Sequence, residues 1–326
     1  MADEAIPEAL EDMVSRSRVA IFIGRNDTGK STLIRDIADK LDVSIIDADI
    51  GQSDIGPPSV VSLGEKRNGR YRMVDGYFCG STSPAKHLLQ LLAGTSRMAA
   101  RVKKFPALVN TTGLATGEVG RILKTEKINA LSPDLIVGIG GKELYYLDAF
   151  GRGAARVIRL PVSPFARIKT RAERTRLRQQ AFAGHFAGGR LATFPFQSFS
   201  TERSLLFNGI SPGSRDDVLR IDVSGAEAMA VVSDRFQGAR ELMNDLGVRL
   251  LHLYHPEDFK GALVGLVDDK GIFAGLGIIE AMDFDSEEIS LFTPARYFSI
   301  LQFGSIRLDP RDFSYRGTFT GLVLRA

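Results

Sequence analysis

The sequence predicts an α/β protein in which a mostly parallel sheet, covered by helices, is followed by a smaller β-rich C-terminal domain. Up to about residue 160, short apolar runs of strand length alternate with longer segments of helical periodicity. This alternation is typical of a parallel sheet with helices on both faces. Beyond residue 194 the segments become strand-rich. We therefore expect two domains, residues 1–193 and 194–326.

The elements of the first domain are expected in the following order. Residues 1–17 form a short amphipathic helix with apolar side chains at helical spacing. Strands are expected at residues 19–23, 43–49, 71–78, 107–110, 135–139 and 156–160. One helix is expected to follow the first strand and its loop and to end at about residue 41, and two more are expected at residues 84–102 and 118–131. A long, arginine-rich helix covers about residues 163–187. In the second domain, residues 268–271 lie between two apolar runs, which predicts a β-hairpin.

A glycine-framed loop follows the first expected strand. It reads G-R-N-D-T-G-K-S-T and fits the pattern G-x-x-x-x-G-K-[ST]. Backbone N–H groups of such a loop, and the positive end of the helix after it, bind phosphate oxygens. Lys30 is expected to reach the β and γ phosphates, and the Ser31 hydroxyl to bind Mg²⁺. The sequence thus predicts a P-loop NTPase domain whose nucleotide-binding residues are Gly24, Arg25, Asn26, Asp27, Thr28, Gly29, Lys30, Ser31 and Thr32.

Two carboxylates, Asp47 and Asp49, stand at the end of the second expected strand. Neighbouring strand ends of a parallel sheet meet at the crevice beside the phosphate loop, so both side chains are expected to face or flank it. One carboxylate near the γ-phosphate can hold the metal shell, and one near an incoming hydroxyl can accept its proton. This pattern favours phosphoryl transfer and leaves open which aspartate has which role.

The arginine-rich helix is the second indication of phosphoryl transfer. Residues 151–190 hold ten basic residues against one acidic residue, although the net charge of the whole chain is only +3. Arg171, Arg174 and Arg178 are spaced to share one helix face, and Arg176 lies off that stripe. Arginines brought over a nucleotide stabilise the charge of the transition state, and a lid that carries them excludes water. A solvated basic face is the other interpretation of such a run.

Composition restricts the setting of the protein. The single cysteine, Cys79, excludes an internal disulfide framework and a multi-cysteine metal site. The acidic N-terminus lacks the apolar core of a signal peptide, and no apolar run is long enough to span a membrane. We expect a cytoplasmic protein that does not act at a membrane.

Several blocks of the sequence, taken together and in order, resemble the polynucleotide 5′-hydroxyl kinases. These are P-loop RNA and DNA kinases related to the pre-mRNA cleavage complex and to the RNA kinases that process ribosomal RNA. The resemblance covers most of residues 19–190. The blocks are the phosphate loop, D-A-D-I-G-Q from residue 47, G-S-T-S-P from residue 80, L-V-N-T-T-G from residue 108, P-D-L-I-V-G-I-G-G-K-E-L-Y from residue 133 and R-T-R-L-R-Q-Q-A-F from residue 174.

This resemblance implies roles for individual residues. Asp49 resembles the general base that takes the proton of the 5′-hydroxyl. Together with Ser31 it would also bind the Mg²⁺ ion. Gln52 would lie near the metal shell or the acceptor. The remaining residues implied are Thr111 and Thr112 as acceptor contacts and Arg174, Arg176 and Arg178 as lid arginines. Where eukaryotic members carry a base-clasping tryptophan, this chain has Leu114, so any base stacking must use tyrosine or phenylalanine.

The sequence therefore predicts an ATP-dependent kinase that phosphorylates the 5′-hydroxyl end of RNA or DNA, with Lys30 and the lid arginines as catalytic groups beside Asp49. GTP is a possible donor. The alternative is an ATP-binding scaffold of an RNA-processing assembly that does not turn nucleotide over. A GTPase switch ranks last, because the chain contains no N-K-x-D motif for reading guanine.

Overall fold

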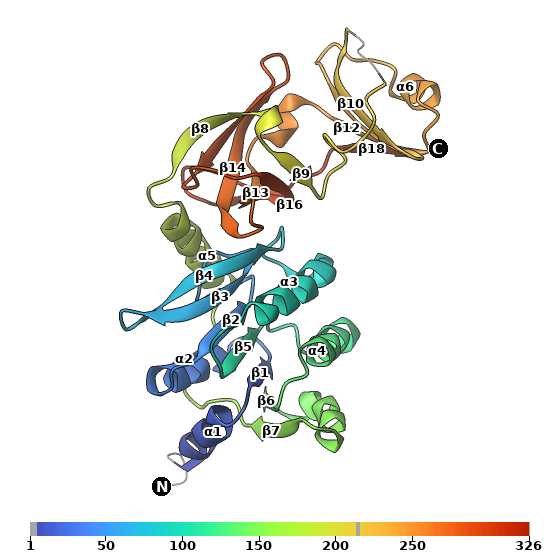
Figure 1. The fold of residues 1–326 in the computed structure, drawn as a ribbon. Coiled ribbons are helices and arrows are strands. Elements are labelled where there is room, and N and C mark those ends of the chain that lie inside the picture. Colours follow the sequence, from blue (N-terminus) through green and yellow to red (C-terminus); the bar gives the residue numbers. More distant parts are fainter. Residues whose placement is uncertain (1–4, 213–215, 326) are drawn as a thin grey trace. The chain divides into compact units, whose positions relative to one another are not determined.

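The computed structural model describes residues 5–212 and 216–325 of the chain (Figure 1). The chain divides into two units, Met1–Ala181 and Phe182–Ala326. The division falls inside helix α5 (Arg171–Phe186), ahead of the boundary expected at residue 193. The end of α5 belongs with the second unit because Phe182 and Phe186 are buried and Phe186 stacks on Phe292 and Phe313.

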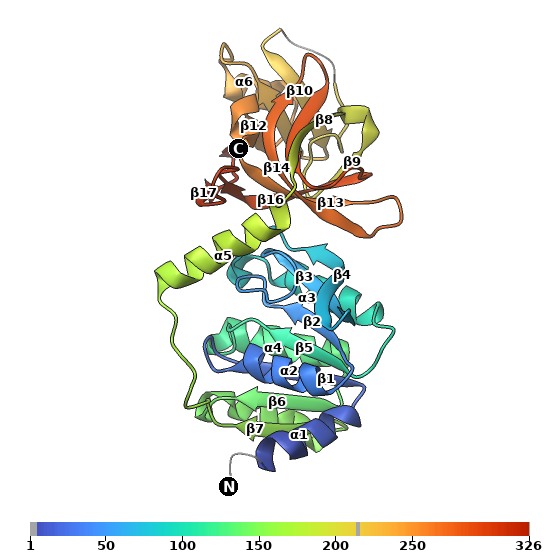
Figure 2. The ribbon, with the colours of Figure 1, turned by 90° about the vertical axis from the view of Figure 1, so that its left-hand side faces the viewer.

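The first unit is built on a seven-stranded sheet with the strand order β4-β3-β2-β5-β1-β6-β7 (Figure 2). The strands β2, β5, β1, β6 and β7 run parallel, which confirms the mostly parallel sheet. The bounds of the strands are β1 (Val19–Gly24), β2 (Ser44–Ala48), β3 (Val60–Arg67), β4 (Arg70–Phe78), β5 (Ala107–Thr111), β6 (Leu135–Ile139) and β7 (Arg156–Leu160).

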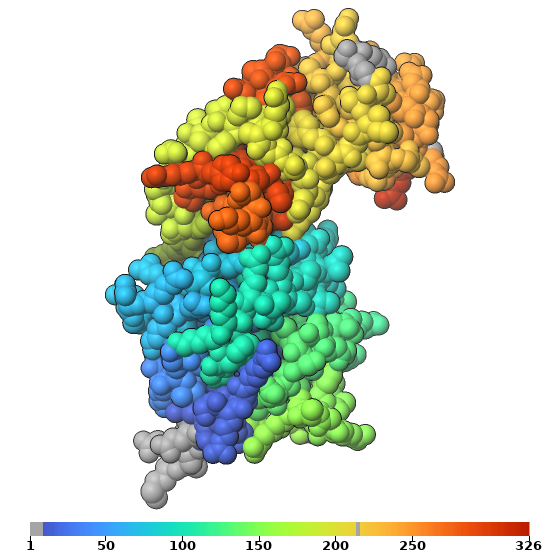
Figure 3. All heavy atoms as spheres, viewed as in Figure 1, coloured from blue at the N-terminus to red at the C-terminus, as the bar shows by residue number. Residues whose placement is uncertain are grey.

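Helices cover both faces of this sheet. Alternate residues of a strand point to opposite faces, so Ile21 and Ile46 pack with α3, α4 and η2, whereas Phe22 and Ile45 pack with α1 and α2. In the space-filling view the side chains of this unit form a continuous mass (Figure 3). The helices are α1 (Ala5–Ser15), α2 (Lys30–Lys40), η1 (Pro84–Lys86), α3 (Leu88–Ala100), α4 (Gly117–Leu131) and η2 (Lys142–Arg152).

Two features of the first unit differ from the prediction. The strand β3 was not predicted, and it forms an antiparallel hairpin with β4 through Asn68 and Gly69, which both have positive φ. The arginine-rich helix was predicted from residue 163 but begins at Arg171. Thr170 and Glu173 explain this start: the Glu173 N–H donates to the Thr170 hydroxyl, and the Thr170 N–H donates to the Glu173 carboxylate, as in a capping box.

The second unit is β-rich, as predicted, and contains two sheets. One has the order β10-β11-β12-β18; the other has the order β17-β16-β13-β14-β15-β8, with β9 paired to β16. The hairpin expected around residues 268–271 is present between β13 and β14, and Gly271 has φ 71°. The bounds are β8 (Arg190–Pro195), η3 (Phe196–Ser198), β9 (Ser200–Glu202), β10 (Val218–Ser224), β11 (Glu227–Val232), α6 (Ala239–Asp245), β12 (Leu250–Tyr254), η4 (Pro256–Phe259), β13 (Ala262–Val267), β14 (Phe273–Asp283), β15 (Glu288–Thr293), β16 (Ile300–Leu308), β17 (Tyr315–Thr318) and β18 (Leu322–Arg325).

None of the helices in the described part of the chain is long and apolar enough to cross a membrane.

Candidate active site

The phosphate loop connects β1 to α2, as the sequence predicts. A Cβ atom on Gly24 would lie 2.5 Å from the carbonyl oxygen of Ile139, so the strand end has no room for a side chain. Gly29 adopts φ 92° and precedes the first residue of α2, where glycine alone takes the left-handed backbone without steric cost. The free N–H groups at the start of α2 therefore face the loop, which suits an anion.

Lys30 and Ser31 begin the helix that follows the loop. The Lys30 side chain is buried, and its Nζ donates to the carbonyl oxygen of Arg25 at 2.7 Å. Burial lowers the pKa of Lys30, while the charges of Asp49 and Asp27 oppose that shift. The Thr28 hydroxyl donates to the same Arg25 carbonyl at 3.0 Å. The loop is thus held in a curved conformation by its own side chains.

A cavity of about 350 Å³ opens over this loop. The loop lines one side through residues 26–32, and Asp49 and Gln52 line another. The remaining walls come from the segment at residues 165–169 and from α5, including Arg178. The cavity is therefore polar next to the loop, where a triphosphate would lie.

A second cavity, of about 480 Å³, adjoins the first. Its lining combines the residues after β2 and β5, the 82–85 segment and three of the four arginines of α5. The two cavities share four lining residues, which are Asn26, Asp49, Gln52 and Arg178. Asp49 thus borders both the space over the phosphate loop and the space beyond it.

Asp47 is committed to the fold around the site. Its carboxylate is buried and accepts the N–H groups of Asp54 and Ile55 at 2.6 and 3.0 Å and the amide of Asn110 at 3.0 Å. Burial raises the pKa of Asp47 to about 7, with a further contribution from the charges of Asp54 and Asp49. Asp47 therefore fixes the segment that follows β2.

Asp49 has a different environment. It lies just beyond the end of β2 and is half-buried. One carboxylate oxygen accepts the backbone N–H groups of Gly51 and Gln52, each at 3.2 Å. These bonds fix the direction of the carboxylate, and the cavity lining leaves it accessible from both sides of the site.

The side chains beside Ser31 fit a magnesium ion. Asn110 donates to the Ser31 hydroxyl at 3.4 Å, and its own Oδ1 is buried without a hydrogen-bond partner among the described residues. With the Asp49 carboxylate, these groups are oxygen donors, which Mg²⁺ prefers. Across residues 5–212 and 216–325 no group of three or more His, Cys, Asp or Glu side chains could hold a metal. A nucleotide would therefore have to supply part of the coordination shell.

The two threonines expected to contact the acceptor are placed differently. Thr112 lines the second cavity, and its contact with an acceptor stays a prediction. Thr111 is fully buried in β5, and its hydroxyl donates to the carbonyl oxygen of Phe22 at 2.7 Å, so it is not presented to a substrate. The difference arises because Thr111 is the last residue of β5, whereas Thr112 follows the strand end.

Lys124 holds Thr112 beside the second cavity, and the sequence did not predict this. It is fully buried on α4, and its Nζ donates to the carbonyl oxygen and the hydroxyl of Thr112 at 2.7 and 3.3 Å. Burial lowers the pKa of Lys124 well below its usual value. A lysine on a helix is normally solvated, so the sequence carries no signal for this role.

The arginines of α5 divide into two groups. Arg174 and Arg178 line the second cavity, and Arg178 also lines the first. Arg171, from the same face, lines the second cavity as well. Arg176 is exposed and, within the described chain, lines neither cavity, so the structure does not bring it to the site with the others. The helical stripe, rather than the run of arginines as a whole, faces the site.

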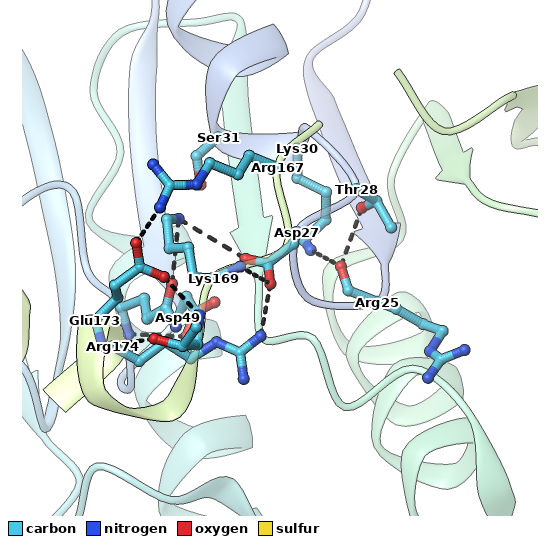
Figure 4. Close-up of polar contacts among 12 residues, drawn as sticks. Arg25, Asp27, Thr28, Lys30, Ser31, Asp49, Arg167, Lys169, Glu173 and Arg174 are labelled. Atoms are coloured by element: carbon cyan, nitrogen blue, oxygen red, sulfur yellow. Dashed lines mark hydrogen bonds and ion pairs between the residues drawn. The ribbon is translucent and has the colours of Figure 1, made fainter. Parts of the chain in front are cut away.

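Asp27, expected among the nucleotide-binding residues, lines the first cavity and also contacts two cationic side chains. Its carboxylate accepts a hydrogen bond from Arg174 at 2.5 Å (Figure 4). The neighbouring loop residues Asn26, Thr28 and Thr32 also line the first cavity. The backbone carbonyl of Arg25 accepts hydrogen bonds from the Thr28 and Lys30 side chains.

Three comparisons place this fold and site among known proteins. A family model described as mRNA cleavage and polyadenylation factor CLP1 P-loop matches residues 24–188. The polyribonucleotide 5′-hydroxyl-kinase PF0112 of Pyrococcus furiosus is 29% identical over 323 residues, covering 90% of this chain and 89% of the relative. The polyribonucleotide 5′-hydroxyl-kinase MJ1315 of Methanocaldococcus jannaschii is 28% identical, with coverages of 89% and 86%.

Solved structures agree with this assignment at the level of the fold. The structure of wild-type Clp1p in complex with Pcf11p superimposes with a TM-score of 0.63 at 11% identity, over 93% of this chain and 79% of that chain. The resemblance to the 5′-hydroxyl kinases is thus confirmed by the family match and by the relatives. With its phosphate loop, its second cavity and its arginine stripe inside the matched region, the chain belongs to the CLP1 P-loop family.

Proposed function

We propose that this protein transfers the γ-phosphate of ATP to the 5′-hydroxyl end of RNA. The observation that carries the proposal is the pair of adjoining cavities that share Asp49, one over a phosphate loop and one beyond it. A hydrolase needs only the first, because water requires no cavity of its own. The relatives are named as polyribonucleotide kinases, which favours RNA over DNA as the acceptor.

In the proposed reaction, Asp49 accepts the proton of the 5′-hydroxyl as the oxygen attacks the γ-phosphorus. A bond forms between that oxygen and phosphorus, and the bond from phosphorus to the β–γ bridging oxygen breaks, leaving ADP. Negative charge spreads over the phosphoryl oxygens during the transfer. Lys30 from the loop and Arg174 and Arg178 from α5 supply the positive charge that stabilises it.

Magnesium is proposed as the resident metal, held by Ser31 and Asp49 together with the nucleotide. When bound, it neutralises charge on the β and γ phosphates. The oxygen donors beside Ser31, including the unpartnered Oδ1 of Asn110 within the described chain, support this assignment.

We also propose a place for the base of the donor nucleotide. The lining of the first cavity includes four apolar residues, Pro58, Phe165, Leu177 and Ala181. The Phe165 ring is 92% exposed, which is unfavourable for so large an apolar group unless it meets a ligand. A purine can stack on such a ring. Stacking does not discriminate between adenine and guanine, so GTP remains a candidate donor.

The decisive experiment combines transfer and binding measurements on Asp49→Asn. This variant should bind ATP like the parent protein and lose transfer to a 5′-hydroxyl oligoribonucleotide by at least about 100-fold, the range expected for a positioned general base. Asp36→Asn, an exposed aspartate on α2, is the matched control and should behave as the parent does. Transfer by Asp49→Asn at the parent rate would show that the general base is another group.

The same assay tests the non-catalytic alternative. Parent protein that binds ATP but does not phosphorylate RNA or DNA of either strandedness would be a nucleotide-binding scaffold. Matched RNA and DNA acceptors, with ATP and GTP as donors, define the substrate at the same time. The expected cytoplasmic location stays a prediction.

A further inference from the structure

Asp27 is an acidic residue inside the phosphate-binding loop. Its side chain is only 4% exposed, and its backbone has φ 58°. An ionised carboxylate is an acceptor only, so it repels phosphate oxygens and cannot donate to them. Its presence beside the expected triphosphate therefore requires cationic partners.

Those partners come from the chain after β7 and from α5. One Asp27 oxygen accepts two hydrogen bonds, one from the guanidinium of Arg174 at 2.5 Å and one from the backbone N–H of Lys169 at 3.1 Å (Figure 4). The Lys169 ammonium lies 3.8 Å from the other oxygen and donates to the Gln52 side chain at 3.4 Å. Asp27 thus connects the phosphate loop to the arginine helix and, through Lys169, to the residues after β2.

The neighbouring acidic residue does not compete for Arg174. Glu173 caps the start of α5 and pairs with Arg167. Burial raises the pKa of Asp27, but the bonds from Arg174 and Lys169 outweigh it, and the pKa lies below its usual value. The pair is therefore ionised at neutral pH.

The contact with Asp27 fixes the orientation of the Arg174 guanidinium. One terminal nitrogen is bound by Asp27, whereas its Nε is buried without a hydrogen-bond partner among the described residues. A guanidinium carries donors in a fixed planar fork, so fixing one position fixes the direction of the others. The second cavity, which Arg174 lines, therefore meets a guanidinium whose orientation is set by Asp27.

We propose that Asp27 is a positioning residue that holds Arg174 and Lys169 over the phosphate loop, and that it is not a ligand of the nucleotide. The inference rests on the proposed kinase function and adds a role for one loop residue. It implies that the arginine helix is fixed to the loop before ATP binds. A kinase gains from this because an arginine already in place need not be ordered during each turnover.

The variant Asp27→Asn tests this role, since it keeps the shape and removes the charge. Calorimetry should give an ATP affinity equal to that of the parent or a few-fold tighter, because a negative charge near the triphosphate is lost. The kcat for transfer should fall by about 30-fold through misplacement of Arg174. In the ligand-free protein, trypsin should cleave after Arg167, Lys169 or Arg171 several-fold faster than in the parent, while Asp36→Asn should match the parent.

A double variant provides the second test. If Asp27 acts through Arg174, Asp27→Asn combined with Arg174→Gln should have the same kcat as Arg174→Gln alone. If the loss of kcat in the double variant equalled the product of the losses in the two single variants, the proposal would be overturned. An ATP affinity at least tenfold weaker in Asp27→Asn, or an unchanged rate of tryptic cleavage, would also overturn it. If the parent transfers no phosphate, the kinase function fails, but calorimetry and proteolysis still decide whether Asp27 holds the helix.

Discussion

Gly113 lies so close to the phosphate loop that an added methyl group should push the loop and the segment after β5 apart. A Cβ atom added there would lie 2.5 Å from the backbone nitrogen of Asn26 and 1.8 Å from its side-chain oxygen. The side chain can rotate away, but the backbone nitrogen belongs to the phosphate loop. Ordinary contact begins at 3.4 Å, so the phosphate loop and the segment after β5 must separate by roughly 1 Å, and a shift of that size can cost about 100-fold in rate.

We therefore expect Gly113→Ala to fold and to lose about 100-fold in kcat/KM for phosphate transfer, with a loss of stability of about 1–3 kcal/mol from overpacking. Initial rates with labelled ATP and a 5′-hydroxyl oligoribonucleotide measure the first effect, and thermal denaturation the second. Gly184→Ala is the matched control, because an added Cβ meets no atom within 4 Å there. Transfer by Gly113→Ala at the parent rate would refute the reasoning.

Two further predictions concern other parts of the chain. Burial lowers the pKa of His185 to about 4, and its Nε2 accepts the Leu276 N–H, so the native state binds fewer protons than the unfolded state below pH 6.5. Lowering the pH from 7 to 4.5 should reduce the free energy of unfolding of the second unit, and the reduction should be about 2.5 kcal/mol larger in the parent than in His185→Gln. Hydrogen exchange around Leu276 measures both values. Equal reductions would contradict a buried, neutral His185. The chain has no tryptophan, so Phe165→Trp is a unique fluorophore: ATP should quench it and tripolyphosphate should not, whereas equal responses would place the base elsewhere.

Local signals in the sequence were sufficient for the sheet and the loop of the first unit. The strands of that unit are short apolar runs bounded by loops, and the phosphate loop has a fixed spacing that geometry dictates. Gly24 and Gly29 are required by close packing and by positive φ, respectively, so they had to appear in any sequence with this loop. The missed strand β3 also had a local signal, because Asn68-Gly69 is a typical hairpin turn.

The partners of the polar residues could not be predicted in the same way. Asp27 and Arg174 are 147 positions apart, and no local pattern records their contact. Lys124 occupies a helix position that looks solvated, yet its ammonium is buried under Thr112. Thr111 and Thr112 are chemically equal in the sequence, yet the Thr111 hydroxyl is bonded to Phe22 inside the sheet, whereas Thr112 is bonded by Lys124 and lines the second cavity.

The three aspartates around the site show how one carboxylate is left for chemistry. Three negative charges beside a triphosphate would oppose its binding. Asp47 is buried and engaged by N–H groups, with a pKa raised to about 7, and Asp27 is neutralised by Arg174. Asp49, among the described residues, accepts only backbone N–H groups, those of Gly51 and Gln52. Of the three, only Asp49 combines a carboxylate whose direction is fixed by backbone N–H groups with a place on both cavities, which is the placement that the proposed general base requires.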